Sequence, residues 1–193
     1  MSEKSDKRIN EIIEAAICEF IEKGFEDASM ENIASRANMS KGGLYHHFNS
    51  KAEILLAVNM KFMEPINDII GQVEKNVSVV DGLKQFIANY LSYWNNHRRE
   101  LSLYFFTMNI SFSNQRIIGY YQVFAHQIFD CFEAHFIKGQ LQGEFKKRDA
   151  RSHAVALISC LDGYLAYMLI DPSLQLDKII VEIQKTFIDD LLK

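Results

Sequence analysis

Apolar residues recur at three- and four-residue spacing along most of this chain, which is the pattern of helices that bury one face. The first such stripe predicts a helix over residues 6–23, an otherwise charged rod with apolar positions at Ile9, Ile12, Ile13, Ala16, Ile17 and Phe20. Gly24 should end this helix, because glycine readily adopts the conformation of a helix C-cap.

Three serines mark where the next three helices should begin. Ser29, Ser40 and Ser50 can each accept a hydrogen bond from a free N–H of the first helical turn. They predict a helix over residues 30–37, a short helix from Lys41, and a long helix over residues 51–77 with a kink near Pro65. Between the first two, Asn38 can take the left-handed conformation of a tight turn, which Met39 should plug. A helix, a three-residue turn and a short helix form a helix-turn-helix.

The rest of the chain predicts five more helices, over residues 81–96, 98–111, 114–138, 149–170 and 174–192. Only 9 glycines and 2 prolines occur in 193 residues, which favours helices over a strand-and-turn fold. The predicted fold is therefore all-α with about nine helices. A three-helix helix-turn-helix domain should occupy residues 1–50, and a larger helical domain residues 51–193.

Charge is unevenly distributed along the chain. The net charge of −4 by itself argues against nucleic-acid binding, but the acids crowd the first helix. Residues 32–51 contain no acid, whereas Arg36, Lys41 and Lys51 are basic and His46 and His47 can become so. This window should be locally cationic.

The short helix that begins at Lys41 sorts its residues onto separate faces. At 100° per residue, Leu44 and Phe48 share an apolar face, and His46 lies opposite with Gly42 and Gly43. Tyr45 and His47 flank the apolar stripe on either side. A helix that enters a DNA groove needs this arrangement, because its centre faces base edges and its flanks reach phosphates. The alternative interpretation is an ordinary solvated surface.

At these residues the sequence resembles the TetR family of bacterial regulators. The resemblance covers roughly the first quarter of the chain and rests on Ile13, Ala15, Ala16, Phe20, Gly24, Phe25, Ser29, Met30, Ile33, Ala34, Ala37, Met39, Ser40, Lys41, Gly42, Leu44, Tyr45, His47, Phe48, Ser50, Lys51 and Leu55. Ala28 stands where a threonine is common, and Asn38 where glycine is usual.

The resemblance implies a nine-helix fold, dimerisation through the last two helices, and release from a palindromic double-stranded DNA operator by a small molecule. The larger domain would then be a ligand-binding and dimerisation domain. The DNA-contacting positions of the family carry over to Ser29, Lys41, Gly42, Gly43, Tyr45, His46, His47 and Lys51. A basic N-terminal arm with Lys4, Lys7 and Arg8 is a further candidate, although such tails are often basic for solubility alone.

Aromatic residues concentrate between Phe86 and Phe136, where 14 of the 23 in the chain occur. They could simply fill a helical core. Tyrosine hydroxyls and the indole N–H must then be satisfied, whereas a small-molecule pocket uses aromatic walls with a few polar groups. The candidate lining residues are Phe62, Tyr90, Tyr93, Trp94, Tyr104, Met108, Tyr120 and Phe124. A bulky, mostly apolar effector would fit, and an organic cation held by ring faces is also compatible.

The last two predicted helices are apolar on more than one face. A helix that needs two burial partners at the end of a chain suggests an interface with a second subunit. Two-fold symmetry would set two recognition helices about 34 Å apart, one turn of DNA. The expected function is a ligand-responsive DNA-binding transcription regulator, a repressor that acts as a homodimer.

Other classes of function have weaker support in the sequence. We find no glycine-rich phosphate loop, nucleophile elbow or metal-ligand spacing, so we expect no enzyme, cofactor or metal site. Cys18, Cys131 and Cys160 are expected to be small apolar packing residues. No apolar stretch looks uninterrupted enough to span a membrane, so a cytoplasmic location is expected. The main alternative is a helical protein-interaction module without DNA binding.

Overall fold

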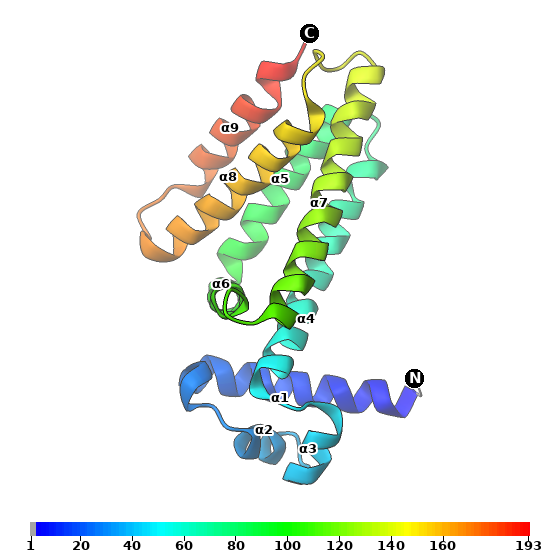
Figure 1. Ribbon diagram of the computed structural model, residues 1–193. Coiled ribbons are helices and arrows are strands. Elements are labelled where there is room, and N and C mark those ends of the chain that lie inside the picture. The colour runs from blue at the N-terminus through cyan, green and yellow to red at the C-terminus, as the bar shows by residue number, and fades with distance from the viewer. Residues whose placement is uncertain (1–2) are drawn as a thin grey trace.

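The computed structural model describes residues 3–193, and every regular element among these residues is a helix (Figure 1). This confirms the all-α prediction. The α-helices are α1 (Glu3–Asp27), α2 (Met30–Arg36), α3 (Lys41–His47), α4 (Lys51–Gly71), α5 (Val79–Asn96), α6 (Arg98–Ser111), α7 (Gln115–Leu141), α8 (Ala150–Ile170) and α9 (Leu176–Phe187). Short 3₁₀ turns cover Val73–Lys75 and Asp189–Leu191.

Local hydrogen bonds set the boundaries of the helix-turn-helix as predicted. The hydroxyls of Ser29, Ser40 and Ser50 accept from backbone N–H groups three residues later, at 3.1, 3.1 and 3.2 Å. Asn38 has a φ of 51°, in the left-handed region that the turn requires. Gly24 has a φ of 76° and a ψ of 169°, so the regular part of α1 ends there.

A buried carboxylate joins α1 to α2. The side chain of Glu19 is fully buried and accepts from Asn32 Nδ2 at 2.9 Å and from Arg36 Nε at 2.7 Å, while Lys23 Nζ lies 3.1 Å away. Burial alone would raise the pKa of Glu19, but these donors outweigh it and hold the pKa below its ordinary value. Arg36 also pairs with Glu22. The charge of Arg36 is therefore neutralised within the domain, which weakens the predicted cationic window.

Helix α4 links the N-terminal helices to the rest of the molecule (Figure 1). It packs against α1 at one end and against α5 and α6 farther along. Ile54, Leu55 and Val58 are fully buried in these contacts. The helix continues through Pro65 and ends at Gly71, six residues before the predicted end. A 3₁₀ turn takes up the following residues.

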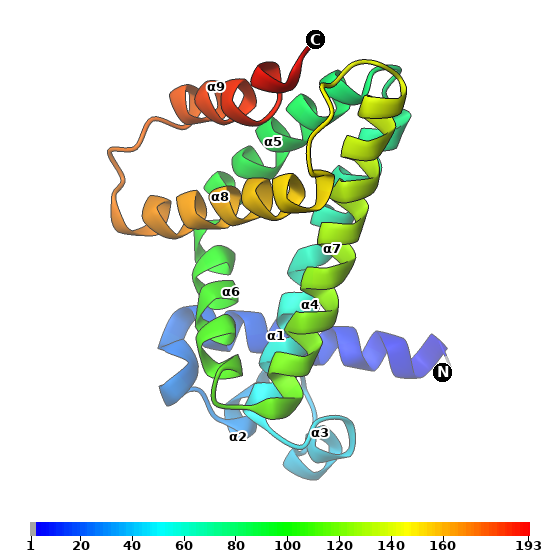
Figure 2. The same ribbon diagram turned by 45° about the horizontal axis from the view of Figure 1, so that its top comes forward.

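The larger body consists of α5 to α9, with α8 packed on α7 and α9 packed on α5 (Figure 2). The loop after α7 ties this body together. The Glu144 carboxylate accepts from the Ser78 hydroxyl at 2.7 Å and from the N–H groups of Val79 and Val80 at 3.2 and 3.0 Å. It thereby caps the start of α5, 66 residues away in sequence. Lys146 N donates to Leu191 O at 2.8 Å, which fastens the C-terminal turn to the same loop.

Helix α8 corrects the expectation that no stretch of the chain is apolar enough to span a membrane. Among the described residues it is the one helix that is long and apolar enough to cross a membrane, judged by length and composition alone. The core helix of a soluble protein passes the same test. Leu157, Leu161 and Leu165 are fully buried within the chain, whereas Tyr167 and Ile170 are 66% and 76% exposed.

Cys18 corrects the expectation that all three cysteines are apolar packing residues. All three are free thiols, but Cys18 is exposed rather than packed in the core. It lies on the solvent side of α1, whose buried stripe falls on Ile12, Ala16 and Phe20. Cys131 and Cys160 are half-buried.

Candidate DNA-binding surface and ligand cavities

The outer face of α3 is held in place by the residues beneath it. Leu44 is fully buried against the domain core, whereas Tyr45 is 44% exposed and His46 is exposed. His47 is half-buried. A Cβ added at Gly42 would meet no atom within 4 Å, so the backbone here is open to a partner. The structure thus presents a short, anchored helix with an accessible face, as the sequence pattern predicts.

Lys41, at the start of α3, does not point freely into solvent. Its ammonium pairs with the carboxylate of Glu31 on α2, and it lies 5.9 Å from the ring centroid of Tyr45. Both charged side chains are more than half exposed. A phosphate could replace Glu31, because an exposed ion pair contributes little net free energy.

Lys51, the first residue of α4, makes hydrogen bonds within the chain. Its ammonium donates to the backbone carbonyls of Phe25, Glu26 and Ala28 at 2.7, 3.0 and 2.7 Å. It also lies 4.8 Å from the centroid of the Phe25 ring. An ammonium has three N–H donors, and all three are used here. Lys51 therefore fastens the start of α4 to the end of α1. The predicted phosphate contact of Lys51 stays a prediction, and it would compete with these hydrogen bonds.

The remaining predicted DNA contacts are placed around this scaffold. Ser29 is half-buried, and its hydroxyl oxygen already caps α2. The proposed N-terminal arm is helical from Glu3 onward rather than a tail, with Lys7 and Arg8 exposed on α1. The side chain of Lys4 lies outside the described residues. DNA contact by these side chains stays a prediction.

A cavity of about 380 Å³ lies among α5, α6, α7 and α8, and we call it the inner cavity. Asp162 is its only acidic residue among those described, and Tyr90 donates from its hydroxyl to Asp162 Oδ1 at 3.1 Å. Burial raises the pKa of the Asp162 carboxyl from 3.8 to about 6. The pKa values of Tyr90 and Tyr104 are also raised, first by burial and then by the nearby charge of Asp162. The described lining residues are Met63, Tyr90, Tyr104, Met108, Ser111, Phe112, Ile118, Tyr121, Gln122, Phe124, Ala125, Ile128, Phe129, Ile158, Ser159 and Asp162.

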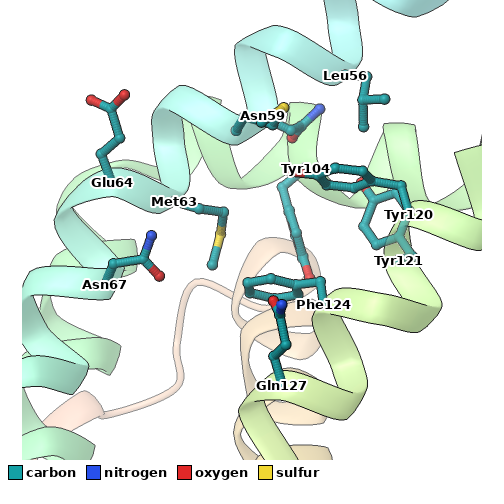
Figure 3. A pocket seen from close by; sticks show the side chains of 11 residues that line it. Leu56, Asn59, Met63, Glu64, Asn67, Tyr104, Tyr120, Tyr121, Phe124 and Gln127 are labelled. Atoms are coloured by element: carbon teal, nitrogen blue, oxygen red, sulfur yellow. The ribbon is translucent and has the colours of Figure 1, made fainter.

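A second cavity, of about 320 Å³, lies between α4, α6 and α7, and we call it the outer cavity. Figure 3 shows α4 side chains on one side and aromatic side chains of α7 on the other. The two cavities share Met63, Tyr104, Tyr121 and Phe124, so these side chains form the wall between them. The described lining residues of the outer cavity are Leu56, Asn59, Met60, Met63, Glu64, Asn67, Tyr104, Tyr120, Tyr121, Phe124 and Gln127.

The structure brings together part of the predicted lining. Tyr90, Tyr104, Met108 and Phe124 line the inner cavity, and Tyr120 lines the outer one. Phe62, Tyr93 and Trp94 line neither cavity. Phe62 and Trp94 are buried in the core, at 7% and 1% exposure, and Tyr93 stacks on His97 with ring centroids 4.2 Å apart. Phe62 and Trp94 are thus core residues, as the alternative interpretation of the aromatic-rich segment expects, although Trp94 Nε1 is buried without a hydrogen-bond partner among the described residues.

Sequence reasoning missed most of the lining residues, among them Asp162, Tyr121 and Asn59. Asp162 is the one acid between Arg151 and Ile170 in an otherwise apolar helix, which is a signal that the sequence does contain. Tyr121 and Asn59 carry no such signal, because which side of α7 or α4 faces a cavity depends on the packing of distant helices. Among the described residues, no group of three or more histidine, cysteine or acidic side chains is placed to hold a metal ion.

The N-terminal part of this chain is similar in sequence to known bacterial regulators. The family model described as bacterial regulatory proteins of the tetR family matches residues 12–58. The biofilm operon icaADBC HTH-type negative transcriptional regulator IcaR of Staphylococcus aureus (strain Newman) is 34% identical over 84 residues, 42% of this chain and 45% of that protein. The HTH-type transcriptional activator FasR of Mycolicibacterium smegmatis is 41% identical over 59 residues, 31% of this chain and 27% of that protein. The matched segment spans less than half the length of either relative.

Solved structures match over the whole chain. A putative TetR-family transcriptional regulator from Mesorhizobium loti MAFF303099 superposes with a TM-score of 0.82, at 20% identity and full coverage of both chains. NalD, the secondary repressor of the MexAB-OprM multidrug efflux pump in Pseudomonas aeruginosa, superposes with a TM-score of 0.76 at 21% identity over 98% of each chain. Because these sequence identities are low, the superpositions show that the proteins share the fold of this chain and no more.

Proposed function

We propose that this chain is a member of the TetR family and a cytoplasmic transcription regulator that binds a palindromic DNA operator as a homodimer, which the family-model match, the relatives and the shared fold support. A bulky, mostly apolar small molecule releases it, so it acts as a repressor. Residues 1–50 form the DNA-binding domain in this proposal, and residues 51–193 sense the ligand and dimerise.

The outer face of α3 is the observation that carries the proposal. Tyr45 and His46 project from a helix whose buried side is fixed by Leu44, and Gly42 leaves the backbone open. In this proposal Gly42, Gly43 and His46 face the base edges, while Lys41, Tyr45, His47 and Ser29 reach the phosphates. Lys51 contributes by positioning α4 on α1.

Helix α4 supports a route from ligand to DNA. Its residues Asn59 and Met63 line the outer cavity, whereas its first residue, Lys51, is clamped to the end of α1. A ligand that displaces α4 therefore moves the helix-turn-helix with it. A small change in the spacing of two recognition helices prevents both half-sites from being engaged. The ligand must bind the DNA-incompetent state more tightly for this switch to work.

The first experiment is the genome-wide recovery of DNA fragments bound by the full-length protein, followed by affinity measurements on the enriched site. If the protein makes several phosphate contacts, the logarithm of its affinity for DNA should fall steeply and linearly with the logarithm of the salt concentration. Tyr45→Ala should weaken binding to all sequences about equally, whereas His46→Ala should change the preferred sequence. Val77→Ala, at an exposed position before α5, is the matched control and should change neither.

The same measurements test the alternative of a protein-interaction module. Such a module would enrich no common DNA sequence. Unchanged affinity in both the Tyr45 and His46 variants would overturn the assignment of α3 as the recognition helix.

A further inference from the structure

Among the described residues, the carboxylate of Asp162 in the inner cavity has no cationic partner. Asp162 has one hydrogen bond, from the Tyr90 hydroxyl, and no lysine or arginine occurs among the described residues that line either cavity. None of the ion pairs among the described residues includes Asp162 either. A carboxylate removed from water is costly unless a positive group pairs with it. A positively charged ligand group beside Asp162 would therefore stabilise its carboxylate.

A second unpaired acceptor lies in the outer cavity, on the buried side chain of Asn59. The Thr107 hydroxyl donates to Leu103 O at 2.8 Å, so its oxygen must accept from the Asn59 amide nitrogen. That nitrogen also donates to Leu55 O at 2.8 Å. Asn59 Oδ1 is thereby left buried without a partner among the described residues. Among the described lining residues, the Tyr121 hydroxyl is also buried without a partner, and it can either donate or accept. Asp162 and Asn59 Oδ1 can only accept, so a complementary ligand must bring hydrogen-bond donors for them.

The walls around Asp162 suit a cation as well. Tyr90, Tyr104, Tyr121 and Phe124 present aromatic rings around the inner cavity, and ring faces attract an organic cation. A ligand with a carboxylate head, such as a fatty acid, would instead meet the charge of Asp162, and no described lining residue could neutralise it.

On this basis, and resting on the proposed function, we propose that the effector is an organic amine or ammonium ion. Its cationic head pairs with Asp162 in the inner cavity, and its apolar body lies among Tyr104, Tyr121 and Phe124 toward α4. The cavity thereby selects against carboxylates of the same size.

Three ligands with one apolar body and different heads test this assignment: 4-phenylbutylamine, 4-phenylbutan-1-ol and 4-phenylbutanoate. Their affinities for the full-length protein are measured by calorimetry at pH 7.5. The amine should bind at least about 10-fold more tightly than the carboxylate, since a charge-assisted contact in a buried site has roughly this strength. Equal or tighter binding of the carboxylate overturns the proposal, and this comparison requires no variant.

The variant Asp162→Asn then tests the residue. It should lower the affinity for the amine about 10-fold, change the affinity for the alcohol less than about threefold, and so abolish the preference. Asp177→Asn, at an exposed acid on α9, is the control and should leave the preference intact. A preference that survives in Asp162→Asn, with folding confirmed by circular dichroism, contradicts the assignment.

DNA binding is measured separately, so the two proposals can fail independently. Wild-type protein that binds its enriched DNA site but shows no amine preference would overturn the ligand class alone. Protein that enriches no DNA site would overturn the proposed function, while the calorimetry would still report on Asp162.

Discussion

Single residues in this chain show how the same charge can have different roles. Lys41 and Lys51 both precede or begin helices near the proposed DNA surface. Yet Lys41 faces one exposed carboxylate, whereas Lys51 gives its three N–H groups to three backbone carbonyls. Only the first can be released to a phosphate without breaking the contact between α1 and α4.

This difference predicts distinct effects of removing each ammonium. Lys51→Met keeps the aliphatic stem but leaves three carbonyls without their donor, which should destabilise the protein by on the order of 1–3 kcal/mol. Its DNA affinity should fall while the slope of log affinity against log salt concentration stays the same. Lys41→Met should instead reduce that slope by about 0.9, as expected for one lost phosphate contact.

Urea unfolding and DNA binding at several salt concentrations measure both quantities. Lys41→Met is the matched control, because it removes the same group from an exposed position. A reduced salt slope in Lys51→Met would show that Lys51 contacts phosphate after all.

At the scale of elements, α8 meets α5 through the Asp162–Tyr90 hydrogen bond, and this contact predicts a pH dependence of stability. Tyr90 on α5 and Tyr104 on α6 face Asp162, and the described α7 residues of the inner cavity are uncharged. The folded state holds the Asp162 proton up to about pH 6, whereas the unfolded chain releases it near 3.8. Stability therefore falls as pH rises through this interval, by on the order of 2–3 kcal/mol in all.

Asp162→Asn removes this cost while its amide oxygen can still accept from Tyr90. The variant should be more stable than the wild type at pH 8, and the difference should vanish near pH 4. Urea unfolding at pH 4, 6 and 8 measures it. Asp177→Asn should instead lose stability at pH 8, by less than about 1 kcal/mol, because Asp177 lies in the first turn of α9. A stability difference that is the same at all three pH values would contradict the prediction for Asp162.

The elements also show what could be predicted from sequence. Caps and turns depend on neighbours within four residues, so Ser29, Ser40 and Asn38 could be assigned from local chemistry alone. The partners of Lys51 lie 23 to 26 residues away, and only tertiary packing brings them together. The aromatic-rich segment could be recognised from composition alone. That Trp94 packs in the core while Tyr104 lines a cavity could not be predicted, because it also depends on tertiary packing.

At the scale of the whole molecule, the outward side of α8 is where we expect the second subunit. Exposed residues with small or apolar side chains follow one side of the helix at Ala156, Gly163, Tyr167 and Ile170. Helix α9 contributes the exposed Val181. In Figure 2 both helices lie away from α1, α2 and α3, so pairing there would leave the α3 faces free for DNA.

Gly163 allows this interface to be tested without disturbing the fold. A Cβ at Gly163 meets no atom within 4 Å in the single chain, so Gly163→Glu should fold normally. Its charge would be buried against the partner, and the variant should sediment as a monomer of 22.3 kDa. Because each subunit would then hold one half-site, operator affinity should fall by about 100-fold or more. Gly71→Glu is the control. A Cβ at Gly71, at the end of α4, also meets no atom within 4 Å, so this variant should stay dimeric and bind DNA normally. A dimeric Gly163→Glu protein would exclude this side of α8 as the interface.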